Sequence, residues 1–226
     1  MENNNFVKLT MDSLVNNSID VGIDFLEMSL DSILEDSILK EIPIVKTVYA
    51  ISKTGFAIRE KHMLKKTIIF LQQLNSNGVG NETYENYKQR LRENDEHLYN
   101  ELEHVIIYID RIVDERKMLI LANLYYNYIS GKFLWDQFLE MVNIVDNLFL
   151  SDLDELNNIY QKQTIFEYEV HNTISLNRLL TQNLISKIES CVREPDGSVS
   201  MYYTDGDYCI SSLGTNLIRY GIISFK

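Results

Sequence analysis

Residues 118–149 read MLILANLYYNYISGKFLWDQFLEMVNIVDNLF, and this stretch decides the fold class. Apolar side chains recur every three or four residues on both sides of Ser130-Gly131, as they do along one face of an α-helix. Ser130-Gly131 itself is typical of a helix end, so the stretch predicts two consecutive helices. A further apolar stripe precedes them, through Leu98, Leu102, Val105, Ile109 and Ile112. Together these patterns predict a mostly α protein built as a multi-helix bundle.

The composition of the 226 residues excludes several classes of protein. With 45% hydrophobic residues the chain can bury a sizeable core, which excludes a disordered protein. Only nine glycines and two prolines leave few turns, which favours long helices over many short strands. Cys191 and Cys209 form no C-x-x-C motif, so neither a disulfide scaffold nor a zinc site is expected. The chain shows no export signal and no cofactor-binding motif, which predicts a cytoplasmic protein without a cofactor.

Two changes of pattern suggest boundaries within the chain. The loop NSNGVGN at 75–81 separates a predicted N-terminal helical arm, residues 1–74, from a helical bundle over residues 75–174. Residues 175–226 form a third predicted part. A short helix is expected over 175–188, followed by two β-prone runs that Asp205-Gly206 would join as a hairpin turn, and then a closing helix over 212–223.

This order of helix, hairpin and helix resembles the second half of a winged helix. The phrase YCISSLGTNLI at 208–218 is similar to the ending that is common in winged-helix repressors. Residues 175–226, however, carry five basic and five acidic side chains. A surface that binds a DNA duplex normally shows a clear positive excess. We therefore predict a small winged-helix-like β-hairpin unit that packs or binds a protein partner and does not bind nucleic acid.

Basic residues gather in one segment of an acidic protein whose net charge is −12. Residues 1–43 hold nine acidic and two basic side chains, whereas residues 44–73 hold six basic and one acidic. The six are Lys46, Lys53, Arg59, Lys61, Lys65 and Lys66. Three interpretations stay open. The cations pair with the acidic segment 1–43 inside the fold, they form a surface that binds a protein partner or a second copy, or they bind an anionic membrane surface.

The same segment carries apolar stripes on two sides of one predicted helix, which runs from Pro43 to Leu74. Ile44, Val48 and Ile51 lie on one side, and Leu64, Ile68 and Leu71 lie near the opposite side. Either the helix bends near Gly55, or its second half is buried on all sides. Because one bundle normally covers one stripe of a helix, we also predict a homo-oligomer, a two-fold dimer in which residues 8–74 supply much of the contact.

A possible catalytic motif is RENDEH at 92–97. It resembles the arginine, four to six residues, histidine motif of HEPN ribonucleases, which are all-helical and usually dimeric. The resemblance implies that Arg92 and His97 would line a composite cleft. Asn94-Asp95 reads equally well as a turn and helix cap. His97, Glu101 and His104 are metal-ligand types, but about 10.5 Å of helix rise separates the two histidines, so no metal site is predicted.

The chain as a whole is similar to a set of uncharacterised bacterial and phage proteins. The similarity is carried by DSILEDSILKEIPIVKTVYAISKTGFAIREKHMLKKTIIFL at 31–71 and by ISGKFLWDQFLEMVNIVDNLFLSDLDEL at 129–156. It implies a prokaryotic source and a phage–host conflict setting, and it assigns no residue a role. We therefore expect a non-enzymatic cytoplasmic interaction or regulatory protein that binds a partner or itself. The alternatives are a HEPN-like ribonuclease and a membrane-perturbing effector that acts through 44–73.

Overall fold

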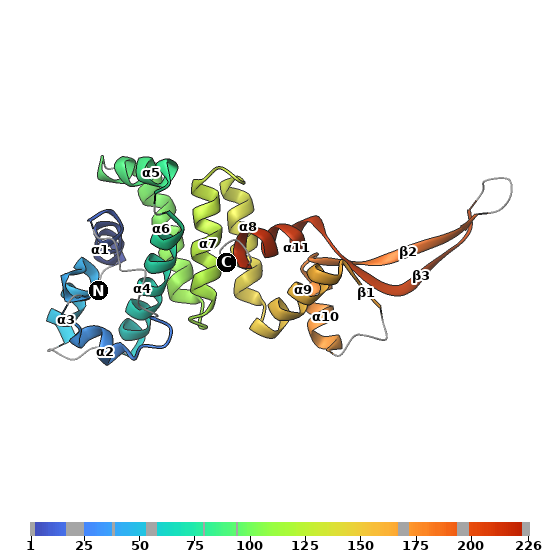
Figure 1. The fold of residues 1–226 in the computed structure, drawn as a ribbon, viewed down its shortest axis with the longest axis horizontal. Coiled ribbons are helices and arrows are strands. Elements are labelled where there is room, and N and C mark those ends of the chain that lie inside the picture. Colours follow the sequence, from blue (N-terminus) through green and yellow to red (C-terminus); the bar gives the residue numbers. More distant parts are fainter. Residues whose placement is uncertain are drawn as a thin grey trace. The chain divides into compact units, whose positions relative to one another are not determined.

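The protein is mostly α-helical, as the sequence predicts. The computed structural model describes residues 3–16, 25–37, 39–52, 58–78, 80–93, 95–166, 172–193 and 199–222. Within these residues the chain forms eleven α-helices and one small antiparallel sheet near its C-terminal end (Figure 1). The predicted fold class, a helical bundle with a small C-terminal β unit, is confirmed.

The first part of the chain is entirely helical among the described residues. Its elements are α1 (Asn3–Asn16), α2 (Leu30–Glu35), the 3-10 turn η1 (Leu39–Glu41), α3 (Pro43–Ser52), α4 (Ile58–Gly78), α5 (Glu82–Arg92), α6 (Glu96–Arg111), α7 (Lys117–Ile129) and α8 (Trp135–Asn147). Helix α7 ends at the predicted stop. Gly131 has a φ of 72°, in the left-handed region that glycine adopts without steric cost.

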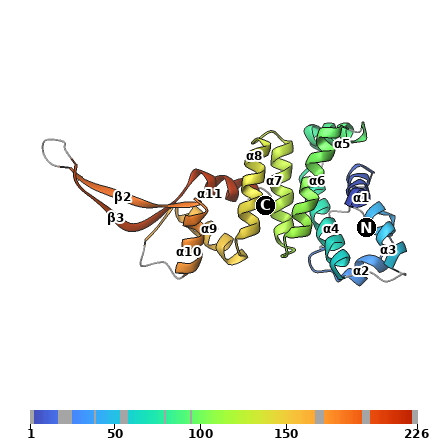
Figure 2. The ribbon, with the colours of Figure 1, turned by 180° about the vertical axis from the view of Figure 1, so that it is seen from behind.

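The second part combines helices with the sheet. Its elements are α9 (Leu150–Lys162), β1 (Thr164–Ile165), α10 (Thr173–Thr181), β2 (Ile185–Arg193), β3 (Val199–Ile210), α11 (Ser212–Leu217) and the π-helical turn η3 (Ile218–Ile222). The strand order is β1-β3-β2 and both pairings are antiparallel. Seen from either side, β1 lies beside β3 at the base of a long hairpin (Figure 2). This arrangement of helix, strand, helix and hairpin is the small C-terminal β unit that the sequence predicts.

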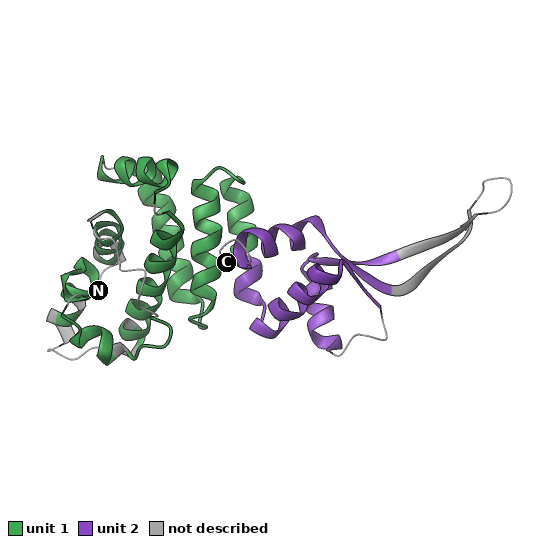
Figure 3. Ribbon diagram, in the orientation of Figure 1, with its two compact units in different colours: residues 1–142 green, residues 143–226 purple. Residues whose placement is uncertain are grey.

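The chain divides into two compact units, residues 1–142 and residues 143–226 (Figure 3). This division differs from the boundaries that the sequence suggests, after residues 74 and 174. Helix α1 contacts α5 and α6 as well as α3 and α4, so the N-terminal segment belongs to the first unit. Helix α9 contacts α10, β1 and β3, so the second unit begins well before residue 175.

Helix α4 is the centre of the first unit. Residues 67–71 are buried one after another, which requires neighbours on every side of the helix. Helices α1, α3, α6 and α7 supply these neighbours. Residues 66–71 are thus buried on all sides, as one of the two arrangements expected for 44–74 requires, and the bend expected near Gly55 lies outside the described residues. The structure assigns α3 and α4 as separate helices where one was predicted, and residues 53–57 between them lie outside the described part.

The hairpin of the second unit is placed differently from the prediction. The helix predicted over 175–188 ends at Thr181, and Asn183 follows with a φ of 56°, a left-handed residue that stops the helix. Residues from Ile185 on form β2. Asp205-Gly206 lies inside β3 and is not the hairpin turn. Between the pairs Lys187↔Tyr208 and Glu189↔Thr204, β2 advances two residues while β3 runs through four, so the extra residues form a bulge.

Candidate functional site

The cations of α4 pair within the first unit. Arg59 forms an ion pair with Asp110, at the end of α6. Lys61 Nζ lies 3.8 Å from an oxygen of Asp31. Lys65 Nζ lies 2.6 Å from Glu115, in the turn before α7, and also donates to the carbonyl oxygen of Leu26. The first interpretation of these residues, pairing inside the fold, is therefore supported. Their main partners are nevertheless Asp110 and Glu115, outside the acidic segment 1–43.

Lys66 lies in the interior and caps a helix. Its side chain is 5% exposed, and Nζ donates to the carbonyl oxygens of Asp110, at 2.9 Å, and Ile112, at 2.8 Å. Those carbonyls belong to the last turn of α6 and have no partner within that helix. Burial lowers the pKa of Lys66, and the negative charges of Asp110 and Glu115 partly oppose this effect. Lys66 is therefore not part of a surface that a partner could reach.

The predicted partner-binding set of six cations does not form one surface. Lys46 is exposed on α3, and Lys53 lies outside the described residues. The other four are held by α2, α6 and the turns around them. No helix of the described chain is both long enough and apolar enough to cross a membrane.

The predicted catalytic pair is separated by the turn between α5 and α6. Arg92, the last residue of α5, donates to the carbonyl oxygen of Val15 at 3.0 Å. His97 stands in the first turn of α6, and among the described residues no hydrogen bond or ion pair joins it to Arg92. The cap that the sequence suggests is present, because Asp95 accepts hydrogen bonds from the backbone N–H groups of His97 and Leu98. Asp95 also binds Arg90, at 2.6 Å.

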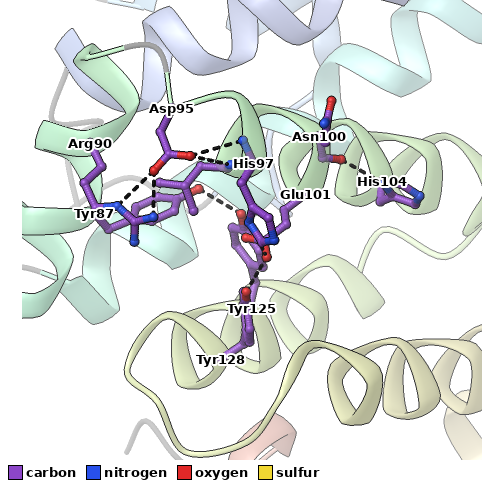
Figure 4. Close-up of polar contacts among 10 residues, drawn as sticks. Tyr87, Arg90, Asp95, His97, Asn100, Glu101, His104, Tyr125 and Tyr128 are labelled. Carbon is purple, nitrogen blue, oxygen red and sulfur yellow. Dashed lines mark hydrogen bonds and ion pairs between the residues drawn. The ribbon is translucent and has the colours of Figure 1, made fainter.

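His97 belongs instead to a polar cluster of α6 and α7 (Figure 4). Its Nδ1 lies 3.3 Å from Glu101 Oε1. Glu101 is only 4% exposed, its Oε1 accepts a hydrogen bond from the Tyr128 hydroxyl, and its Oε2 is buried without a hydrogen-bond partner among the described residues. Burial raises the pKa of Tyr128, and the hydrogen bond to Glu101 raises it further, so Tyr128 stays a donor.

The chemistry open to this cluster is limited. An imidazole beside a carboxylate can serve as a general base, and His97 is exposed to solvent. Its neighbours, however, are engaged with one another, since the hydroxyls of Tyr87 and Tyr125 lie 2.8 Å apart and His104 Nδ1 binds the carbonyl oxygen of Asn100. Nowhere in the described part of the chain do three histidine, cysteine or carboxylate residues gather to hold a metal.

The second unit contains a buried carboxylate that the sequence did not reveal. Asp152 on α9 accepts hydrogen bonds from its neighbour's backbone, Phe149 N–H at 2.8 Å, and from two side chains of α10, Ser175 Oγ at 2.5 Å and Arg178 at 2.6 and 2.7 Å. Burial tends to raise the pKa of Asp152, but the hydrogen bonds from Arg178, Ser175 and the Phe149 N–H outweigh it, so the pKa is lowered. These bonds join α9 to α10.

The same contact exposes an apolar surface. The Arg178 guanidinium lies 4.8 Å from the centre of the Phe149 ring, and Phe149 is nevertheless 63% exposed. Ile174 lies one turn before Arg178 on α10 and is 66% exposed. We call Phe149, Ile174 and Arg178 the α9–α10 face. Arg178 is the only basic residue of α10, and Asp152 already neutralises it.

Comparison with known proteins gives no relative from which a role could be transferred. No family model matches the chain, and neither a curated protein nor a solved structure shows significant similarity to it. The similarity to bacterial and phage proteins therefore stays a prediction.

The cap formed by Lys66 yields a first prediction. Lys66→Met is expected to lower the free energy of unfolding by about 1–3 kcal/mol, because two buried carbonyl oxygens lose their donor. Lys46→Met, the matched change at an exposed position, should alter it by less than about 0.5 kcal/mol. Urea denaturation of both variants measures this difference, and equal stabilities would contradict the capping role.

The cluster around Glu101 yields a second prediction. Tyr128→Phe should destabilise the protein by about 1–3 kcal/mol, because it removes the one hydroxyl that donates to a buried carboxylate. Tyr108 lies on α6 and its hydroxyl has no hydrogen bond among the described residues, so Tyr108→Phe serves as the control and should stay close to wild type. Thermal denaturation compares the two, and a Tyr108→Phe effect as large as that of Tyr128→Phe would argue against the cluster.

The lowered pKa of Asp152 predicts a dependence on pH. A carboxyl group whose pKa is lower in the folded state stabilises the fold above its unfolded value, about 3.9, and this contribution is lost as the pH falls through the folded value. The free energy of unfolding of wild type should therefore be higher than that of Asp152→Asn at pH 7. The difference between the two should become smaller below about pH 4. Denaturant titrations of both proteins across this range test the prediction, which a constant gap would refute.

Proposed function

We propose that this protein is a non-enzymatic interaction protein, and that the α9–α10 face is where it binds a protein partner. The observation that carries the proposal is the exposure and the charge of the residues of that face. Two large apolar side chains are exposed there, Phe149 against the Arg178 guanidinium and Ile174 one helical turn from Arg178 on α10. Arg178 itself is paired with Asp152. Adjacent exposed apolar residues are typical of surfaces that bind proteins.

The charges of the second unit argue against nucleic acid as the partner. If the unit bound a duplex as helix-turn-helix proteins do, α10 would supply the residues that enter the groove. Its single arginine is held by Asp152, and residues 143–226 contain eleven acidic and six basic side chains. Phosphate contacts supply most of the affinity for DNA, and this unit offers few cations to make them.

The two alternative functions receive less support. Cleavage of RNA by Arg92 and His97 would require both groups to approach one phosphate, whereas Arg92 is bound to Val15 and His97 to Glu101. A membrane-binding role for 44–73 would require free cations, whereas Arg59, Lys61, Lys65 and Lys66 have partners within the first unit. The cytoplasmic location and the setting of phage–host conflict belong to this proposal as expectations from the sequence.

The predicted homodimer also belongs to the proposal, but its basis changes. The prediction of a dimer rests on two apolar stripes of one helix, which one bundle normally does not cover together. The neighbours of α4 inside the first unit cover both sides of it. A homodimer would therefore use other surfaces than the buried half of α4.

Affinity capture from the source organism tests the proposal. Wild type, Phe149→Ser and Ile174→Ser would be used as baits, with Val113→Ser as the control, because Val113 is an exposed apolar residue of the first unit. Quantitative mass spectrometry should find at least one protein that both face variants lose and that wild type and the control retain. Identical protein sets from all four baits would contradict the proposed function.

A further inference from the structure

We infer that the α9–α10 face receives a basic amphipathic helix of the partner protein. Apolar side chains of that helix would cover Phe149 and Ile174, and its lysines or arginines would meet the carboxylate of Glu155 on α9. This inference rests on the proposed function and adds the chemical class of the partner.

The apolar part of the face is compact. The Phe149 ring lies under the Arg178 guanidinium, and Ile174 lies one helical turn from Arg178 on the same side of α10. Both apolar side chains are therefore neighbours of Arg178. In the first unit, by contrast, exposed large apolar residues of the described chain come from separate elements, with Ile107 on α6, Val113 after α6 and Leu134 before α8.

The surroundings of the face are acidic. Residues 143–162 contain four acidic side chains and one basic side chain. Glu155 on α9 is half-buried, and its side chain has no hydrogen bond or ion pair among the described residues. Glu155 follows Asp152 by three residues, so it lies on the side of α9 that faces α10. Arg178 adds no net positive charge, because Asp152 neutralises it.

This combination favours a cationic partner. Complementary charges speed the approach of two proteins and fix their orientation, and apolar contacts supply most of the affinity. The net charge of −12 repels anionic partners at long range. A partner with an apolar stripe and basic flanks satisfies both parts of the face.

The local backbone favours a helix over an extended peptide. An extended peptide binds by adding a strand to a free sheet edge, where main-chain groups are available. The face consists of residues from the start of α9 and from α10, and it includes no strand and no sheet edge. A partner must therefore bind through side chains, which an amphipathic helix presents at intervals of three and four residues.

A second copy of the same face would be a poor occupant. A two-fold contact places the same surface on both sides, so Glu155 would meet a surface that carries the same negative charge. Like charges in one interface repel each other, and Arg178, the cation of the face, is already paired with Asp152.

Titration of the purified full-length protein with synthetic helices tests the inference. The probe is an 18-residue peptide of leucine and lysine with an amphipathic pattern. One control peptide has the same composition in a scrambled order, and a second has glutamate in place of lysine. Isothermal titration calorimetry should show binding of the amphipathic leucine–lysine peptide and at least about tenfold weaker binding of both controls.

Protein variants then locate the site. Phe149→Ser and Ile174→Ser should each weaken binding of the leucine–lysine peptide about tenfold, whereas Val113→Ser should leave its binding unchanged. Glu155→Lys should also weaken it, and Glu140→Lys, the same charge change on α8 of the first unit, should not. Circular dichroism and thermal denaturation show which variants keep the fold. If one of the two serine variants fails to fold, the other still decides the outcome.

The outcomes separate the inference from the proposed function. The inference is overturned if the leucine–lysine peptide does not bind wild type, binds all variants equally, or binds no better than the glutamate peptide. In that case a protein captured through Phe149 and Ile174 would still support the proposed function, with a partner of different chemistry. Binding of a DNA duplex that is lost in Ile174→Ser would overturn both.

Discussion

A charged side chain that leaves water must find its partners inside the chain, and this requirement organises both units. Lys66 reaches the last carbonyl groups of α6 and so connects α4 to the end of that helix. Asp152 receives the guanidinium and the hydroxyl of α10 and so joins α9 to α10. Glu101 has partners on one oxygen only, Oε1, which Tyr128 and His97 approach. Side chains that hold the fold in this way are not available to bind another molecule.

Much of the fold could be predicted from the sequence, because the buried side of a helix appears in the sequence as apolar residues that recur every three or four positions. The stripe through Leu98 to Ile112 becomes the buried side of α6, and the stop at Ser130-Gly131 becomes a glycine with positive φ. The hairpin could not be placed in the same way. Asp205-Gly206 is a strong turn signal on its own, but the actual turn depends on which strands pair, and β2 begins at Ile185 because Asn183 ends α10 early.

The candidate site was harder to predict. A sequence shows which side chains are positive or negative, but it does not show which of them pair in the fold. The concentration of cations at 44–73 is real, yet Arg59 pairs with Asp110 and Lys65 with Glu115, each about fifty residues further along the chain. Arg92 and His97 are close in sequence, but a turn between two helices sends Arg92 to Val15. The Asp152 contact depends on the packing of α9 against α10, and no local motif announces it.

The fold of the second unit does not decide what the unit binds, because function resides in particular side chains carried by a fold. In the second unit one contact has two consequences. By holding Arg178, Asp152 removes the only cation of α10 from any role with phosphate, and it lays the guanidinium over Phe149. A paired guanidinium over a partly exposed ring is a flat surface of low net charge, and Ile174 extends it. A polyanion would bind such a surface weakly, whereas apolar contacts would contribute most of the affinity. The unit therefore fits a protein partner better than a nucleic acid.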